Sequence, residues 1–206
     1  MNYLDQFIDA LKFLTKFNKE YRDMNPDFEE TRQILSSFQK ATNEDTYINF
    51  RKFIKDFSEA FIQKIPEEHV INKCHAASYS FWSAFQNLEY SDAFSIQITV
   101  GNVFYKGENI YNLSKGNLTK IINKGPSRDE ALDAHVWVTL EDMTVIDLTI
   151  IPTLVHRGLL PKSELDTGRV LIWRECDKSD YSYQPILVDN DFTQRVDETQ
   201  TVITYP

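Results

Sequence analysis

The chain has 206 residues, of which 42% are hydrophobic and 26% charged, enough apolar material for a sizeable core. Its formal net charge of −9 argues against nucleic-acid partners and anionic membrane surfaces, which bind basic faces. Two cysteines, Cys74 and Cys176, are too few for a disulfide framework. No signal-peptide pattern or apolar run of roughly 20 residues occurs, so we predict a cytoplasmic protein without a membrane partner. The sequence leaves the oligomeric state open.

Residues 1–65 are predicted to be a helical N-terminal extension. Asn25-Pro26-Asp27 and Asn43-Glu44-Asp45 divide it into three segments, because each can end one helix and start the next. Every segment carries an apolar stripe at helical spacing, and the stripes are rich in phenylalanine. This aromatic density indicates that the extension packs on residues 66–206, which we predict to form the core of the fold.

A further helix is predicted to start at Cys74. Ile65-Pro66 closes the preceding section, and apolar residues then recur at helical spacing from Cys74 onward. Residues 76–78 are small, so another element can approach the first turn closely. A helix N-terminus stabilises a thiolate and offers free backbone N–H groups to an oxyanion. His75 is expected to point about 100° away from Cys74.

Residues 93–105 are predicted to form a strand pair or one bent strand, with the bend at Gly101-Asn102. Residues 106–133 are polar and are predicted to be mostly loop, with a short helix around residues 118–122. A long loop in this position is either a substrate lid or a plain surface excursion.

The central prediction is a hairpin built from residues 134–140 and 144–149. Both arms alternate with the period of half-buried strands, and residues 141–143 suit a short loop. If Leu140 pairs with Thr144, Trp137 lies opposite Asp147, and His135 lies one diagonal step from Asp147 on the same face. The imidazole and the carboxylate can then touch, and such a carboxylate prepares the other ring nitrogen to act as a base.

The rest of the chain is predicted to be less regular. Residues 152–161 are expected to be irregular, residues 169–175 a strand, and residues 181–191 a turn with a short apolar run. The tail, residues 198–205, is either an edge strand or loose. Cys176 is predicted to be non-catalytic because acids flank it, and His156 to be structural.

The order Cys74, His135, Asp147 resembles the transglutaminase-like superfamily, which shares a papain-like core with arylamine N-acetyltransferases. The motifs that carry the resemblance are the Cys-led helix, His135-Val136-Trp137 and Asp147-Leu148-Thr149, within residues 66–175. The resemblance implies an α+β papain-like fold in which residues 66–206 are the catalytic core. It does not imply the protein cross-linking of the large animal enzymes, because their calcium site and flanking β-domains are missing.

The resemblance also implies roles. Cys74 is the expected nucleophile toward an amide, ester or thioester, His135 the base, and Asp147 the residue that orients His135. The Cys74 backbone N–H is one expected oxyanion donor, and the second would come from His69 or Asn72. Trp137 is expected to wall the cleft. These roles predict a cysteine hydrolase or acyltransferase acting on a peptide, a protein or a small acyl or amide substrate, without a cofactor.

Two other interpretations stay open at this point. In the first, Cys74, His135 and Asp147, with or without His75, instead hold a hydrolytic zinc, although no paired-ligand motif supports a metal site. Alternatively, the chain keeps a papain-like fold and serves as a catalytically inactive binding protein. For that interpretation, the helical face of residues 1–65 would be the partner surface.

Overall fold

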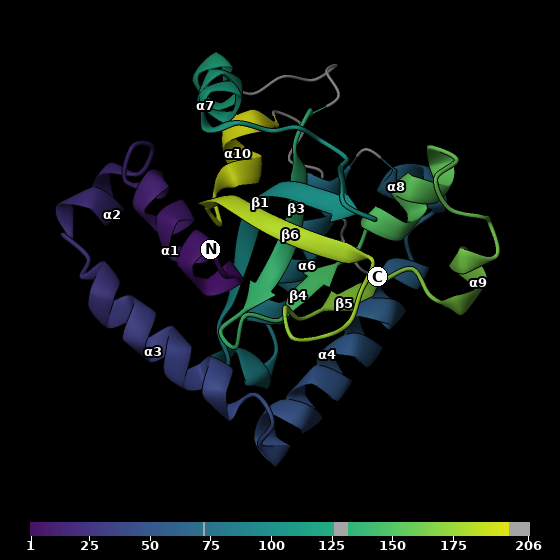
Figure 1. Ribbon diagram of the computed structural model, residues 1–206, viewed down its shortest axis with the longest axis horizontal. Coiled ribbons are helices and arrows are strands. Elements are labelled where there is room, and N and C mark those ends of the chain that lie inside the picture. The colour runs from purple at the N-terminus through teal and green to yellow at the C-terminus, as the bar shows by residue number, and fades with distance from the viewer. Residues whose placement is uncertain (72, 126–131, 198–206) are drawn as a thin grey trace.

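An antiparallel sheet lies at the centre of an α+β fold in the computed structural model, which describes residues 1–71, 73–125 and 132–197 (Figure 1). The strand order is β2-β1-β3-β4-β5, and β6 also pairs with β1. The described strands are β1 Ile96–Tyr105, β2 Glu108–Asn109, β3 His135–Leu140, β4 Val145–Asp147, β5 Leu171–Trp173 and β6 Tyr181–Val188.

The predicted central hairpin is present as β3 and β4. Val138 pairs with Ile146 and Thr139 with Val145, and the Leu140 N–H donates to the Thr144 carbonyl over 2.8 Å. This register, continued by one residue, places Trp137 opposite Asp147. Met143 closes the loop with a positive φ of 66°. The predicted register is therefore confirmed.

Strand β1 is one bent strand, the second of the two predicted alternatives. Its pairing with β6 shifts between Val100 and Gly101, which marks a bulge. Gly101 is required here, because a Cβ would lie 2.1 Å from the Gln184 carbonyl oxygen. Pro185, opposite Gly101, falls at this irregular point, where a missing N–H disturbs the ladder least. Residues 181–191 were predicted to hold a turn and a short apolar run, whereas residues 181–188 form the strand β6.

Residues 1–65 are largely helical, as predicted, in helices α1 Tyr3–Leu14, α2 Lys19–Asp23, α3 Phe28–Ala41 and α4 Asp45–Gln63. Helix α1 lies beside β6, whereas α3 runs outside α1 along the edge of the molecule (Figure 1). The apolar stripe of α1 is buried against the sheet, but α3 buries none of its residues completely. The extension thus contributes to the same hydrophobic clusters as residues 66–206.

Helix α6, Cys74–Gln86, begins at the predicted residue and covers one face of the sheet. Phe81 and Phe85 are fully buried and pack against β-strand residues such as Val138. The opposite face of β3 carries Trp137, which packs in a cluster with Tyr3 of α1. Helices therefore enclose the sheet from both sides.

The remaining described helices are α5 Glu67–Val70, the 3-10 helix Glu89–Asp92, α7 Lys115–Lys124, α8 Ile150–His156, α9 Glu164–Thr167 and α10 Phe192–Val196. Helix α7 confirms the predicted short helix. Helix α8 corrects the expectation of an irregular stretch: Pro152 lies in its first turn, where a helix tolerates proline. None of the described helices has the length and apolarity needed to cross a membrane. The predicted alternatives for the tail concern residues 198–205, outside the described residues.

Candidate active site

Cys74 lies at the N-terminus of α6 against the beginning of β3. Its sulfur contacts the Ala134 carbonyl oxygen at 3.5 Å, and one turn later the Ser78 hydroxyl donates to the Val136 carbonyl over 3.1 Å. The small residues at the start of α6 allow this approach, as predicted. The first N–H groups of a helix have no partner within the helix, so they are available to a negative group at the sulfur. Cys74 is 5% exposed.

His135 and Asp147 form the predicted contact. The imidazole Nε2 lies 2.6 Å from Asp147 Oδ2, and both side chains are fully buried. Because Nε2 is engaged by the carboxylate, Nδ1 is the ring nitrogen left for the sulfur. Among the described residues, His135 Nδ1 has no hydrogen-bond partner. This is the arrangement in which a carboxylate orients an imidazole toward a nucleophile.

Asp147 is held by more than the imidazole. Its Oδ1 accepts the backbone N–H groups of Thr149 and Ile150 over 3.0 Å each, at the start of α8. Its Oδ2 accepts the Tyr183 hydroxyl over 2.9 Å as well as His135. Asp147 therefore holds the turn before α8 and orients the histidine at the same time. Tyr183 did not emerge from the sequence, because its place depends on the long-range pairing of β6 with β1.

Aromatic rings fix the plane of the His135 imidazole. Tyr111 stacks on it with a centroid distance of 4.9 Å, and Trp137 lies 6.0 Å away. Arg157 lies over the Tyr111 ring, 4.8 Å from its centroid. Trp137 is on the His135 side of the strand, as predicted, but it is fully buried and its indole N–H donates to the Tyr3 hydroxyl. It supports the ring from within the core and presents no surface to solvent.

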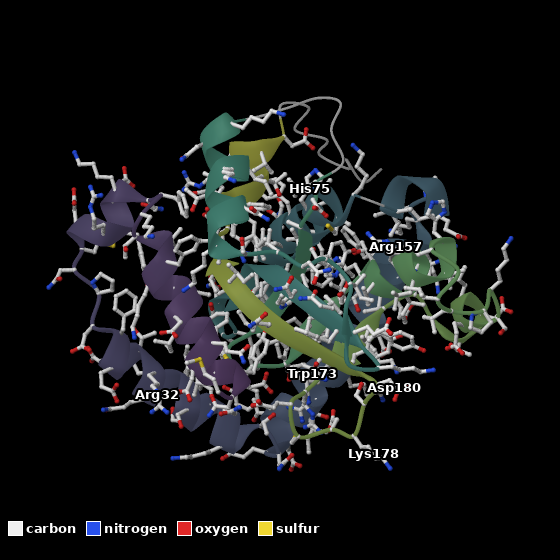
Figure 2. All side chains as sticks on the ribbon, turned by 45° about the horizontal axis from the view of Figure 1, so that its top comes forward. Arg32, His75, Arg157, Trp173, Lys178 and Asp180 are labelled. Atoms are coloured by element: carbon white, nitrogen blue, oxygen red, sulfur yellow. The ribbon has the colours of Figure 1, made fainter. Side chains whose placement is uncertain are left out.

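His75 was expected to point about 100° away from Cys74. Its imidazole nevertheless contributes, together with His135, to lowering the pKa of the Cys74 thiol. Its Nε2 lies 2.9 Å from Asp197 Oδ2, and the pair is almost completely buried. Figure 2 shows His75 at the end of the sheet near α7 and α10, and Trp173 toward the other end. A helical wheel gives the direction of a Cα–Cβ bond but not the reach of a long side chain in the first turn.

The electrostatics favour a charged site at neutral pH. Burial raises the pKa of the Cys74 thiol, but the two imidazoles outweigh burial and lower that pKa to about 6. Burial lowers the pKa of His135, yet the Asp147 carboxylate outweighs it, and the pKa stands well above its usual range. The pKa of His75 is also raised, because the Cys74 sulfur and Asp197 outweigh burial. The preferred state is a thiolate beside protonated imidazoles.

The other predicted residues contribute less. Asn72 and the side chain of His69 lie outside the described residues, so the predicted second oxyanion donors stay predictions. Cys176 and His156 are exposed on the surface. Within residues 1–71, 73–125 and 132–197, no group of three or more His, Cys, Asp or Glu side chains is placed to hold a metal ion.

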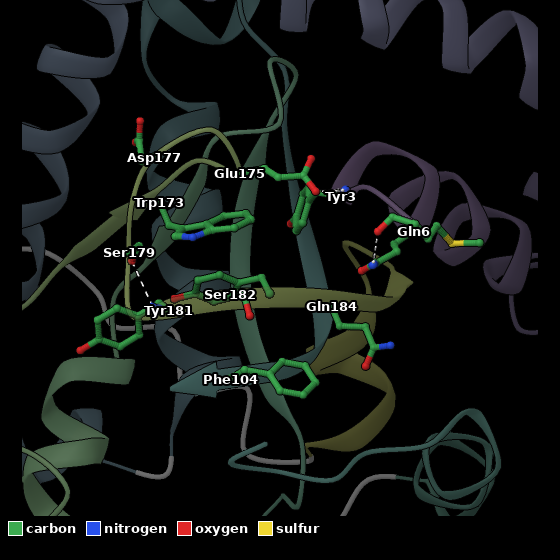
Figure 3. Close-up of a pocket in the computed structure, with 12 residues that line it drawn as sticks. Tyr3, Gln6, Phe104, Trp173, Glu175, Asp177, Ser179, Tyr181, Ser182 and Gln184 are labelled. Atoms are coloured by element: carbon green, nitrogen blue, oxygen red, sulfur yellow. Dashed lines mark hydrogen bonds between the residues drawn. The ribbon is translucent and has the colours of Figure 1, made fainter. Parts of the chain in front are cut away.

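A separate cavity of about 440 Å³ lies behind Tyr183. Figure 3 shows Trp173 and Tyr181 on one side of this cavity and Tyr3 and Gln6 on the other. Cys74, His135 and Asp147 do not line it. Tyr183, which lines the cavity, connects it to the triad, because the Tyr183 hydroxyl is bonded to Asp147.

Comparison of the chain with protein-family models, curated proteins and solved structures gave no match.

Proposed function

We propose that the protein is a cysteine-dependent hydrolase or acyltransferase with a papain-like, transglutaminase-like core. The observation that carries the proposal is the buried His135–Asp147 pair, at 2.6 Å, beside a thiol whose pKa is lowered to about 6. The chain order of a cysteine-led helix, a histidine strand and an aspartate strand supports the same assignment.

The first half of the reaction forms a thioester. The Cys74 thiolate attacks the carbonyl carbon of an amide, ester or thioester, and the carbonyl oxygen becomes an oxyanion near the N-terminus of α6. The protonated His135 then gives its Nδ1 proton to the leaving group as the bond between that group and the carbonyl carbon breaks. Asp147 stabilises the imidazolium and keeps the ring in place.

The second half regenerates the thiolate. His135, now neutral, takes a proton from water or from an acceptor amine as that molecule attacks the thioester carbonyl. The carbon–sulfur bond breaks, its electron pair returns to sulfur, and His135 is protonated again. Water as the acceptor gives hydrolysis, and an amine gives acyl transfer.

The experiment that tests this proposal is acylation by p-nitrophenyl acetate in a Cys176→Ala background, which removes the exposed second thiol. The proposal predicts a burst of p-nitrophenolate and an intact mass increased by one acetyl group on Cys74. His135→Gln should slow release of the acetyl group by about 10²- to 10⁴-fold, so the acetylated form accumulates. Failure of the folded protein to acetylate at Cys74 would refute the proposal and favour the inactive binding protein.

A further inference from the structure

His75 directly follows Cys74 at the start of α6, and both His75 and His135 lower the pKa of the Cys74 thiol. Each of these imidazoles is bonded to its own carboxylate. His135 Nε2 is 2.6 Å from Asp147, and His75 Nε2 is 2.9 Å from Asp197. In both rings Nδ1 is buried and has no hydrogen-bond partner among the described residues. The two pairs come from different parts of the fold, and in each the carboxylate engages Nε2 and leaves Nδ1 as the unbonded ring nitrogen.

The second pair is built by the docking of α10 on α6. The Thr193 hydroxyl donates to the His75 carbonyl over 3.1 Å, and the Asp197 N–H donates to the Thr193 carbonyl over 2.9 Å. These bonds place Asp197 one helical turn beyond Thr193, against the imidazole. His75 is 6% exposed and Asp197 is also 6% exposed. A buried imidazole and a buried carboxylate at this distance are stable when they share a proton.

We propose that His75 and Asp197 form a second imidazole–carboxylate pair, which holds the Cys74 sulfur as a thiolate independently of His135. His75 acts directly on the reacting sulfur, whereas Asp197 is a positioning residue that keeps His75 protonated and in place. The inference rests on the proposed function for its catalytic meaning and deepens it by assigning a second histidine to the site.

The physical reason lies in the two halves of the reaction. In a site with one histidine, the proton that stabilises the thiolate is the same proton that goes to the leaving group. The charge of His135 therefore changes during each turnover, because the ring is neutral in the thioester and is protonated again only when the acceptor attacks. His75 takes no part in these proton transfers, and Asp197 stays bonded to its Nε2 in both halves. A protonated His75 therefore stabilises the sulfur as the carbon–sulfur bond breaks and the electron pair returns to it. The proton balance of the reaction is unchanged, because His75 neither gains nor loses a proton.

Other titratable groups near the sulfur must be included in any titration. Besides the two imidazoles, Tyr111 interacts with Cys74 and with His135, and burial raises its pKa. The carboxylates of Asp147 and Asp197 stand behind the imidazoles. The tyrosine stays neutral in the neutral pH range. The titration of the sulfur below the free-thiol range is therefore controlled by the two imidazole–carboxylate pairs.

The test is the pH dependence of Cys74 alkylation by iodoacetamide in the Cys176→Ala background. The measured quantity is the midpoint of the pH–rate profile, since a thiolate of lower pKa is also intrinsically less nucleophilic and absolute rates mislead. The variants are His135→Gln, His75→Gln, the double variant and Asp197→Asn. His156→Gln, which changes an exposed histidine, is the matched control.

The inference predicts that the His135→Gln midpoint stays below the free-cysteine value of about 8.5, whereas the double variant titrates at or above it. His75→Gln and Asp197→Asn should each raise the midpoint from the wild-type value, and His156→Gln should leave it unchanged. A His135→Gln midpoint equal to that of the double variant would overturn the inference. Unfolding by urea identifies any variant that does not fold.

A second measurement needs no substitution at His75. The chain has four histidines, so their imidazole resonances can be titrated by NMR before and after Cys74 is capped with a neutral methylthio group. Loss of the thiolate should lower the pKa of both His75 and His135. A His75 pKa that does not change on capping would contradict the inference even if every variant at that position unfolds.

The two proposals fail in different ways. If the acetylated enzyme forms but the thiolate depends entirely on His135, the proposed function stands and the role of His75 is refuted. If the thiolate persists without His135 but no acetylated enzyme forms, the second pair is present and the proposed function is refuted.

Discussion

Replacing Asp147 by asparagine removes the negative charge behind His135 and keeps the size of the side chain. The carboxylate accepts two backbone N–H groups on Oδ1 and the donors of His135 and Tyr183 on Oδ2. An amide oxygen can keep the two backbone bonds at the start of α8. The amide NH₂ would then face the two donors on the other side, so both bonds to Oδ2 are lost.

The cost follows from these two bonds. Hydrogen bonds to a buried charged group contribute about 1.5–3 kcal/mol each, so the loss of two should destabilise Asp147→Asn by about 3–6 kcal/mol. A domain whose free energy of unfolding exceeds this loss, within the usual range of about 5–15 kcal/mol, remains folded. The amide also favours the neutral ring, which lacks the positive charge that stabilises a thiolate, so the midpoint of Cys74 alkylation should rise.

Urea unfolding and the pH profile of alkylation measure the two effects. Asp142→Asn is the matched control, because Asp142 is also buried and accepts Arg51 over 2.8 Å and the Thr144 N–H over 3.0 Å. The control should lose comparable stability and keep the wild-type midpoint. An unchanged midpoint in Asp147→Asn, or an equal rise in both variants, would refute the coupling of Asp147 to the sulfur through His135.

Three further predictions concern the fold and its pH dependence. Gly101→Ala should cost up to about 3 kcal/mol in urea unfolding, because its Cβ would lie 2.1 Å from the Gln184 carbonyl oxygen; an unchanged stability would contradict the tight bulge. Tyr3→Phe should cost about 1–3 kcal/mol, because the buried indole N–H of Trp137 loses its acceptor over 2.9 Å; no loss would show that the Tyr3 hydroxyl is not needed to satisfy this N–H. The thiol pKa is lowered to about 6, so the stability of the wild type relative to Cys74→Ala should rise with pH between about 6 and 8.5. The unfolded chain then binds a proton that the folded thiolate does not, and a difference independent of pH would contradict the thiolate.

The raised pKa of His135 gives a contribution to stability that falls as the pH rises, which is opposite to the contribution of the Cys74 thiol. Its contribution to stability is complete below the unfolded histidine pKa of about 6.5 and is lost as the pH rises through the higher folded value. The thiolate and the imidazolium therefore stabilise the fold together only in the window between their two folded pKa values.

The hairpin and the His135–Asp147 contact could be predicted because their determinants are local. The alternation of residues 134–140 and 144–149 and the short loop between them set the register, and the register alone brings His135 and Asp147 together. The Cys74 helix was predictable for a similar reason, since the helical spacing of its apolar residues is a local pattern that begins at Cys74.

The missed features depend on contacts between distant segments. Asp197 meets His75 across 122 residues, and Tyr183 meets Asp147 through the pairing of β6 with β1. No local pattern encodes either contact. Helix α8 was missed because residues 152–161 were expected to be irregular, whereas Pro152 occupies the first turn of a helix, where its missing N–H costs nothing.

The central claim is that the folded site turns Cys74 into an activated nucleophile. The most direct test is the midpoint of Cys74 alkylation in the native Cys176→Ala protein, compared with the same protein unfolded in urea. The account predicts a native midpoint of about 6 and an unfolded midpoint of about 8.5. A native midpoint at or above the unfolded value would show that burial governs the thiol and that the imidazoles do not activate it.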